Sequence, residues 1–372
     1  MLHGIMGGRL FASGDIYEKN KLKYKQNQLL WIHTPQMNGF FRPTWNLPRR
    51  GAEIVRELDN ILDENNKVIA LRCHIDGSSV HPVAAADVDD MFSGHANNGE
   101  YGAAGTYTAL VNALKTSLGK ENAFFISYDW RMNITNTAQS LKPILNNLID
   151  SYDEIYIIAH SLGGLVALEY ITSLQNKGKI KLITIGTPFW GAPSALHILK
   201  TGKALPLNYC KSGIQQTAQN LSSVYELLPT RNYVERKPFI NLRNGIIKAA
   251  KLLDADETAK FVRNTVENTF LLDKAINFHE QFNAAERFNN IESYAIIGRN
   301  KPTLTTLYAR FENGLFPHET KSGDGTVPLI SATMDGLIPE SKISYFDETH
   351  SALPSNKKVI ELILKKHLLL KI

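Results

Sequence analysis

Cysteine is scarce in this sequence: Cys73 and Cys210 are the two cysteines among 372 residues. Two cysteines build neither a disulfide-rich scaffold nor a zinc site of paired Cys-x-x-Cys motifs. Long apolar runs are also absent, and the stretch 155–159 has five residues against the ~18 of a membrane-spanning helix. No basic leader followed by an apolar stretch opens the chain. We therefore predict no transmembrane segment and a protein that is cytoplasmic or exported without a standard signal peptide.

Neither sign of charge dominates, with 41 Lys+Arg against 36 Asp+Glu. The densest basic stretch, residues 19–25, contains four lysines. Such a stretch is more typical of a solvated face than of a nucleic-acid-binding patch, so we predict no nucleic-acid partner. Attraction to an anionic lipid surface stays open. The hydrophobic content of 43% argues against intrinsic disorder.

Short apolar runs alternate with amphipathic stretches along most of the chain. Runs with little polar–apolar alternation suit strands that are covered on both faces. The predicted strands are residues 67–72, 123–128, 154–159, 180–185, 293–298 and 342–346. The predicted helices are residues 106–118, 138–150, 162–174 and 356–369. Strands that alternate with helices predict an α/β fold with a mostly parallel sheet flanked by helices.

One stretch, residues 195–290, breaks this alternation because its pattern predicts helices, turns and polar loops with no clear strand. In an open parallel sheet, ligands bind outside the carboxyl ends of the strands, where such an insertion would lie. We therefore predict a largely helical cap in this stretch. The core would be residues 1–194, with an early loop or cap insertion at about 11–66, together with residues 291–372.

The sharpest local motif is a serine between a strand and a helix. An apolar strand runs into Ala159-His160-Ser161-Leu162-Gly163, and a helical pattern follows at once. This context is typical of a nucleophile elbow, in which small residues at 159 and 163 avoid the neighbouring strand and helix. The N–H of Leu162 would then donate to an oxyanion. The alternative is an ordinary serine N-cap on a βα turn.

An acid and a histidine follow the serine in the order that α/β hydrolases use. Asp324 lies between two glycines in a tight loop, and His350 lies between the last predicted strand and the last predicted helix. In a triad, His350 takes the proton of Ser161, and Asp324 fixes the imidazole tautomer. The alternatives are an ordinary Asp-Gly turn and a surface-loop histidine. The histidines at 74, 95, 160 and 279 are weaker base candidates, and His160 should point away from the serine hydroxyl.

A second oxyanion donor is expected from a loop near the start of the chain. Within residues 2–8, Gly4 allows a close backbone approach, and the N–H of Ile5 would be the donor. The alternative is a mobile N-terminus. Acyl transfer through a serine triad needs no metal and no organic cofactor, so we predict neither.

Several segments together resemble the lecithin:cholesterol acyltransferase-like family of α/β-hydrolases, which includes phospholipid:diacylglycerol acyltransferases and lysosomal-type phospholipases A. The matching segments are HGIMGGRL (3–10), YDWR (128–131), AHSLGG (159–164), GTPFWGAP (186–193), SVYELLPT (223–230), GDGTVPL (323–329) and THSALP (349–354). The resemblance implies an α/β-hydrolase fold and an acyl-enzyme, drawn from a lipid ester, on the elbow serine.

The resemblance also assigns supporting residues. It implies that Asp129 and Arg131 pair to hold a loop, and that YDWR ends a strand beside the nucleophile strand. It implies further that Gly164 supports the elbow and that Thr187 and Pro188 line the wall of the substrate pocket.

The sequence departs from the family pattern in four places. Ala159 replaces a more usual glycine, and His3 stands where many members have proline. The chain starts almost inside the oxyanion loop, so the core strand that should precede His3 is expected to be nearly absent. The cap disulfide of extracellular members has no counterpart in Cys73 and Cys210, which fits a reducing compartment.

The interpretation that we prefer is a serine acyl-ester hydrolase or O-acyltransferase of the lipase or phospholipase A type. Its partner would be a lipid or another acyl ester, and the sequence sets no oligomeric state. The alternatives are a soluble esterase for non-lipid esters and a catalytically silent binding module on a hydrolase scaffold. The aromatic residues Trp31, Phe40, Phe41 and Trp45 could touch a bilayer or belong to the core of the cap.

Overall fold

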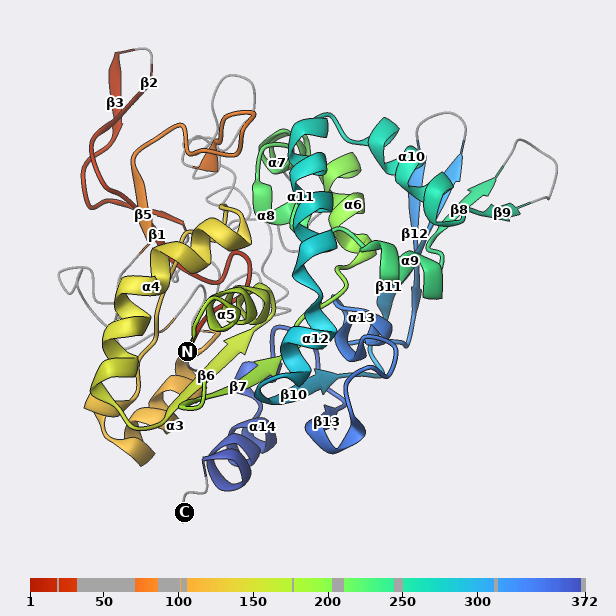
Figure 1. Cartoon of the computed structure of the whole chain (residues 1–372). Coiled ribbons are helices and arrows are strands. Elements are labelled where there is room, and N and C mark those ends of the chain that lie inside the picture. Colours follow the sequence, from red (N-terminus) through yellow and green to blue (C-terminus); the bar gives the residue numbers. More distant parts are fainter. Residues whose placement is uncertain are drawn as a thin grey trace, which may run out of the picture.

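The computed structural model describes residues 1–18, 20–31, 71–85, 101, 106–175, 177–202, 211–243, 250–310 and 314–368 (Figure 1). Several positions named above lie outside these ranges: most of the expected early insertion, Phe40, Phe41, Trp45, His95, Cys210 and residues 67–70. The two remaining residues of the strand expected at 67–72, Leu71 and Arg72, are not in a strand.

A four-stranded parallel sheet forms the centre of the molecule. Its order is β13 (Ile343–Phe346), β10 (Glu292–Gly298), β7 (Ile180–Ile185) and β6 (Ile155–His160) (Figure 1). Each of these strands agrees with a predicted strand to within one residue at either end. Their apolar, β-branched runs are therefore reliable strand signals, as expected for a sheet that is buried on both faces.

Beyond β6, the sheet continues through the first residues of the chain. Leu2 forms parallel bridges to Ala159 on one side and to Ile126 on the other. The strand expected at 123–128 is reduced to a single bridge at Ile126, and it lies next to Leu2 rather than beside β6. The expectation that YDWR ends a strand beside the nucleophile strand is therefore wrong, because Leu2 lies between Ile126 and Ala159. The core strand before His3 is present as the one bridged residue Leu2.

Helices cover both faces of this sheet because successive strand residues point to opposite sides. One face carries Ile157, Leu182 and Ile297, which share a core cluster with residues of α4 (Ile134–Ser151) and α5 (Leu162–Thr172). The other face carries Ile158, Ile183 and Ile296, which pack with residues of α3 (Thr108–Leu118), α14 (Lys357–Leu362) and the π-helical turn Ile363–His367. This layered arrangement confirms the predicted α/β fold with a mostly parallel sheet.

A second sheet has the order β12 (Gly314–Thr320), β11 (Thr303–Arg310), β8 (Ile240–Arg243) and β9 (Ala250–Leu252). The expectation of no strand within 195–290 is wrong for β8 and β9. These segments are too short to identify by themselves, and β8 becomes a strand by pairing in parallel with β11, far along the chain. The expected cap therefore contains sheet as well as helices, while its boundaries at 194 and 290 stay a prediction.

The other elements complete the chain. The helices between β7 and β10 are α6 (Pro193–Thr201), α7 (Lys211–Ala218), α8 (Ser222–Glu226), α9 (Arg231–Arg236), α10 (Ala255–Thr265), α11 (Thr269–Phe282) and α12 (Ala284–Asn289). Helix α13 (Leu329–Thr333) precedes β13. The early strands are β1 (Leu10–Ala12), β2 (Ile16–Glu18), β3 (Lys21–Tyr24), β4 (Leu29–Trp31) and β5 (Val83–Ala85), and β2 and β3 form a hairpin that stands away from the body in Figure 1. Of the helices that the structure describes, none has the length and apolar character needed to cross a membrane.

A buried carboxyl group joins the helices that follow β7 to the core. The side chain of Glu226, at the end of α8, accepts the N–H of Ile134 at the start of α4 at 2.7 Å. Burial raises the pKa of Glu226 to about 8, the charge of Glu169 adds to this shift, and the N–H of Ile134 opposes it. The Nε2–H of His279 in α11 donates to the backbone carbonyl of Glu226 at 2.7 Å. Three helices therefore meet at Glu226.

The raised pKa of Glu226 makes stability depend on pH. Its usual pKa is 4.5 and its folded pKa is about 8, so between these values the folded chain holds a proton that the unfolded chain releases. Stability therefore falls as the pH rises through this window. Burial lowers the pKa of His279 from 6.5 to about 4, so His279 changes the stability only below pH 6.5. We predict that the unfolding free energy drops by up to ~2 kcal/mol between pH 6.5 and 8, and that Glu226→Gln removes most of this drop.

Urea unfolding at several pH values measures this difference. Glu235→Gln is the matched control because Glu235 lies on the surface of α9, with its side chain 49% exposed, and should keep the wild-type pH dependence. Equal slopes between pH 6.5 and 8 in the wild type and Glu226→Gln would contradict the prediction.

Candidate active site

Ser161 lies at the turn between β6 and α5 in a strained backbone conformation, with φ 55° and ψ −126°. Such a conformation costs a non-glycine residue of the order of 1–3 kcal/mol and is typical of functional sites. Neighbouring backbone crowds the turn: a Cβ on Gly4 would lie 2.7 Å from the Cβ of Ser161, and a Cβ on Gly163 would collide with the carbonyl oxygen of His3. Glycine at both positions lets the N-terminal loop approach the serine.

Ser161, His350 and Asp324 form a continuous hydrogen-bonded line. The Oγ of Ser161 lies 2.9 Å from Nε2 of His350, and Nδ1 of His350 lies 2.7 Å from Oδ2 of Asp324. The other carboxylate oxygen of Asp324 accepts the N–H groups of Thr326 at 2.9 Å and Val327 at 2.7 Å. The buried carboxylate is thus held on both oxygens, and the imidazole can hold a proton on Nδ1 while Nε2 faces the serine.

Asp324 reaches this position by an excursion of the chain. After β10, the hairpin β11–β12 leaves the parallel sheet, pairs with β8 and returns. The two ends of the excursion meet in a parallel bridge between Lys301 and Asp324. The acid also packs closely on the end of β10, since a Cβ on Gly298 would lie 2.5 Å from the Cβ of Asp324. All three residues of the line are therefore at the carboxyl ends of parallel strands.

The loop that precedes β1 carries Ile5, one of the two predicted oxyanion donors. Gly4 and Gly7 close a turn, with the N–H of Gly7 donating to the carbonyl of Gly4 at 3.0 Å. Nδ1 of His3 also lies 2.8 Å from that carbonyl. These contacts fix the peptide between Gly4 and Ile5. Within the described ranges, the N–H groups of Ile5 and Leu162 donate to no protein acceptor, as an oxyanion hole requires.

His3 is a core histidine of this loop. Its ring is fully buried and stacks on Tyr128, with centroids 4.0 Å apart. Nε2 of His3 accepts the N–H of Tyr128 at 3.1 Å, so Nδ1 carries the proton that it donates to the carbonyl of Gly4. Burial lowers the pKa of His3 to about 4, which keeps the ring neutral. His3 thus supports the loop that contains Gly4 and Ile5.

The other elbow residues lie behind the serine. Ala159 is fully buried beside Leu2, and the sheet accommodates its methyl group. A Cβ on Gly164 would collide with the side chain of Thr187, which packs against α5 from below. Pro188 is buried next to it. Thr187 is therefore in contact with the elbow helix, and its role with Pro188 in a pocket wall stays a prediction.

Two neighbours of the triad were not identified as site residues from the sequence. Both ring nitrogens of His160 are engaged: Nε2 lies 3.1 Å from the carbonyl of His350, and Nδ1 lies 2.9 Å from the hydroxyl of Tyr107. The same hydroxyl accepts the N–H of Gly4 at 2.9 Å. His160 could have been noticed as the neighbour of the serine, but no motif marks Tyr107, the residue before α3.

Two other base candidates within the described ranges, His74 and His279, do not contact the serine. His74 is exposed, and His279 is bonded to the carbonyl of Glu226. Asp129 and Arg131 form an ion pair with N···O 2.6 Å, in which the Arg131 side chain is completely buried and also donates to the hydroxyl of Ser79. This geometry supports a structural role for the pair, in which it holds the loop that contains both residues.

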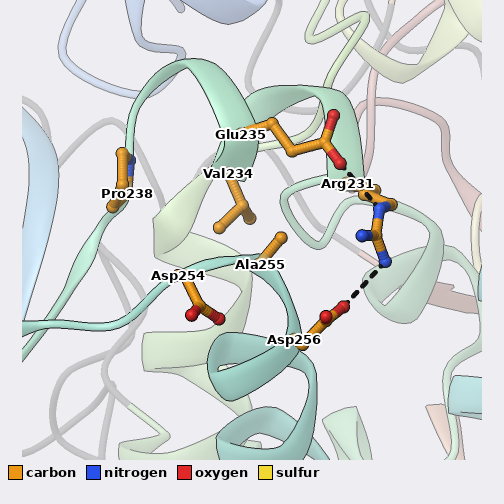
Figure 2. Close-up of a pocket in the computed structure, with 7 residues that line it drawn as sticks. All are labelled: Arg231, Val234, Glu235, Pro238, Asp254, Ala255 and Asp256. Carbon is orange, nitrogen blue, oxygen red and sulfur yellow. Dashed lines mark hydrogen bonds and ion pairs between the residues drawn. The ribbon is translucent and has the colours of Figure 1, made fainter.

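A pocket lies elsewhere on the surface, between α9 and the start of α10 (Figure 2). Its volume is about 340 Å³, and its lining residues are Arg231, Val234, Glu235, Pro238, Asp254, Ala255 and Asp256. Arg231 is already bonded to Glu235 and Asp256. None of the predicted catalytic residues lines it. Among the described residues, no group of three or more His, Cys, Asp or Glu side chains is arranged to hold a metal ion.

Comparison with known families identifies the chain. The sequence model of the family described as "Lecithin:cholesterol acyltransferase" matches residues 102–306, which is more than half of the chain. The chain belongs to the lecithin:cholesterol acyltransferase family. The resemblance found in its motifs is thereby confirmed, and the protein falls within the hydrolases and acyltransferases of the α/β-hydrolase class.

A solved structure agrees at the level of the fold. A chain in the crystal structure of the Tle4–Tli4 complex aligns with a TM-score of 0.63 at 13% identity, covering 96% of this family member and 95% of that chain. An esterase, EaEST, from Exiguobacterium antarcticum gives a TM-score of 0.22 at 14% identity, covering 46% of this chain and 84% of its own. That low TM-score is no evidence of a shared fold. No curated protein sequence matches the chain.

The buried pair of Asp129 and Arg131 predicts a large loss of stability. Asp129→Ala removes the carboxylate that pairs with the buried guanidinium of Arg131, which costs about 3 kcal/mol or more. The matched control is Asp273→Ala, because Asp273 pairs with Arg263 on the surface, where both side chains are about half exposed, and should cost under about 1 kcal/mol. Urea unfolding of both variants measures the contrast. Similar losses in the two would show that the buried pair has no special structural weight.

Proposed function

We propose that this member of the family is a serine acyl-ester hydrolase or acyltransferase that acts on lipid esters through Ser161, His350 and Asp324. The observation that carries the proposal is the line of short hydrogen bonds from the Ser161 hydroxyl through His350 to the buried Asp324, set on a strained elbow. A serine N-cap would not need this conformation, a histidine partner or an acid behind the histidine.

The geometry supports a two-step acyl transfer. Nε2 of His350 takes the proton of Ser161 as its Oγ attacks the ester carbon, and the N–H groups of Ile5 and Leu162 receive the oxyanion. His350 then gives the proton to the leaving alcohol, and the acyl group stays on Oγ. In the second step His350 removes a proton from the acceptor, whose oxygen attacks the acyl carbon. The bond between the acyl carbon and Oγ then breaks, and His350 returns the proton to Ser161. Water as acceptor gives a fatty acid, and an alcohol gives a new ester.

The lipid substrate is inferred from family membership and from the surface. On the β2–β3 hairpin, Tyr17 lies opposite Leu22, and their exposed fractions are 56% and 43%. Lys21 and Lys23 are exposed on the same hairpin. Apolar side chains flanked by cations are typical of peripheral contact with an anionic lipid surface. We include such contact, at this projecting hairpin, in the proposed function.

Replacing the serine tests the chemistry. Ser161→Ala should abolish labelling by a fluorophosphonate probe and lower ester turnover by at least about a thousandfold, because no other nucleophile lies on the line. Incubation of the wild type with defined phospholipids, with and without an alcohol, followed by mass spectrometry identifies the donor and the acceptor.

The outcomes separate the alternatives. A clear preference for short-chain soluble esters would favour the non-lipid esterase. A folded wild-type chain that fails to react with the probe would favour the silent binding module. Turnover by Ser161→Ala near the wild-type level would rule out the assignment of the nucleophile.

The hairpin gives a separate prediction for membrane contact. The double variant Tyr17→Ser, Leu22→Ser should bind phosphatidylserine-containing vesicles about 30-fold more weakly, since each of the two side chains contributes of the order of 1 kcal/mol when it is buried in the lipid. Its turnover of a soluble short-chain ester should equal that of the wild type. Leu252→Ser is the control, because Leu252 is 53% exposed but lies on β9. Vesicle sedimentation measures binding, and unchanged binding of the double variant would place the contact elsewhere.

A further inference from the structure

Two buried side chains beside the triad take no part in the proton transfers described above. Tyr107, which is 2% exposed, and His160, which is 4% exposed, lie between the oxyanion loop and the loop that carries His350. We propose that Tyr107 and His160 are positioning residues that form a hydrogen-bonded relay between these two loops. This inference rests on the proposed function of the site.

The relay has a single consistent set of hydrogen positions. The backbone carbonyl of His350 can only accept, so Nε2 of His160 must carry a proton and donate to it. The neutral ring then has a bare Nδ1, which accepts the hydroxyl proton of Tyr107. The hydroxyl oxygen of Tyr107 in turn accepts the N–H of Gly4. Every donor along the relay has one acceptor, so the chain of bonds is ordered from Gly4 to His350.

One end of the relay holds the oxyanion loop. Gly4 is bonded through its N–H to Tyr107 and through its carbonyl to Gly7 and His3. Both polar backbone groups of Gly4 are therefore hydrogen-bonded, and Tyr107 is the partner of its N–H. Losing the bond to Tyr107 would leave a buried N–H unpaired and free the residue before Ile5, the predicted donor, to shift.

The other end holds the base. The N–H of His350 donates to the backbone carbonyl of Asp324 at 2.8 Å, and its carbonyl accepts from His160. The N–H and the carbonyl of His350 are thus both hydrogen-bonded, in addition to the contacts of its ring. These two bonds fix the backbone position, and the distance between Nε2 and the Ser161 hydroxyl depends on that position and on the rotation of the ring.

Burial also gives His160 the right charge for this place. The rings of His160 and His350 have centroids 4.7 Å apart. His350 becomes positive when it takes the serine proton, and a second cation at this distance would oppose that step. Burial, and secondarily the positive charge of His350, lowers the pKa of His160 well below its usual value. The relay therefore stays neutral while the neighbouring imidazole is charged.

Tyr107→Phe tests the oxyanion end. The variant removes one oxygen atom and keeps the ring, so the N–H of Gly4 loses its acceptor. We expect kcat per active site to fall about 10- to 100-fold with little change in KM, and the Ki of a trifluoromethyl ketone, which forms an oxyanion on the serine, to rise by a similar factor. Active sites are counted by stoichiometric reaction with a fluorophosphonate, so misfolded protein does not affect either value.

Tyr170→Phe is the matched control. The hydroxyl of Tyr170 is also bonded to one side chain, Asn146, at 2.8 Å, but it lies at the far end of α5. This control should keep the wild-type kcat per site and the wild-type Ki. Tyr107→Phe with both values unchanged would overturn the relay, whereas a wild type without ester turnover would instead overturn the proposed function.

Replacements of His160 test the base end and serve if Tyr107→Phe does not fold. Gln places an N–H donor near the position of Nε2, whereas Leu offers none. We expect His160→Gln to keep at least tenfold more kcat per site than His160→Leu, with about equal KM values. Equal kcat values for the two variants would show that the bond to the His350 carbonyl does not position the base.

Discussion

The parallel bridges of Leu2 are the constraint on which the site depends. The N–H of Leu2 donates to the carbonyl of Ile158, and its carbonyl accepts the N–H of His160, so the first residues of the chain are locked against β6. His3 and Gly4 consequently leave the sheet directly above the elbow. The close packing of His3 against Gly163 and of Gly4 against Ser161 follows from this register. This packing holds the strained backbone of Ser161 in place.

The polar groups near the serine differ in burial and in hydrogen bonding. His3 and His160 are kept neutral because water cannot reach them. Asp324 is equally buried, but three hydrogen bonds from His350, Thr326 and Val327 compensate its carboxylate. His350 keeps partial access to solvent. Of these histidines, it is the one whose ring contacts the serine hydroxyl and is also partly exposed.

The sequence predicted those parts of the molecule whose signals are local. The strands β6, β7, β10 and β13 are continuous apolar runs. Ser161 and His350 follow two of them closely, and Asp324 stands between two glycines in a tight loop. Long-range pairing could not be read in the same way. The residues around Ile126 have the apolar pattern of a strand. Ile126 alone pairs with the sheet, because its partner there is the single bridged residue Leu2. The strand β8 exists only through β11, and Tyr107 meets Gly4 only in the folded chain.

The excursion that carries Asp324 has a consequence for how this chain can vary. Its two ends are tied together by the bridge between Lys301 and Asp324, and the acid rests on Gly298. Because the residues at its two ends pair with each other, the length of the hairpin does not set the position of the carboxylate. The paired strands β11 and β12 can therefore differ in length without moving the acid. The geometry of the hydrogen-bonded line and the shape of the second sheet are, in this respect, separately adjustable parts of one protein.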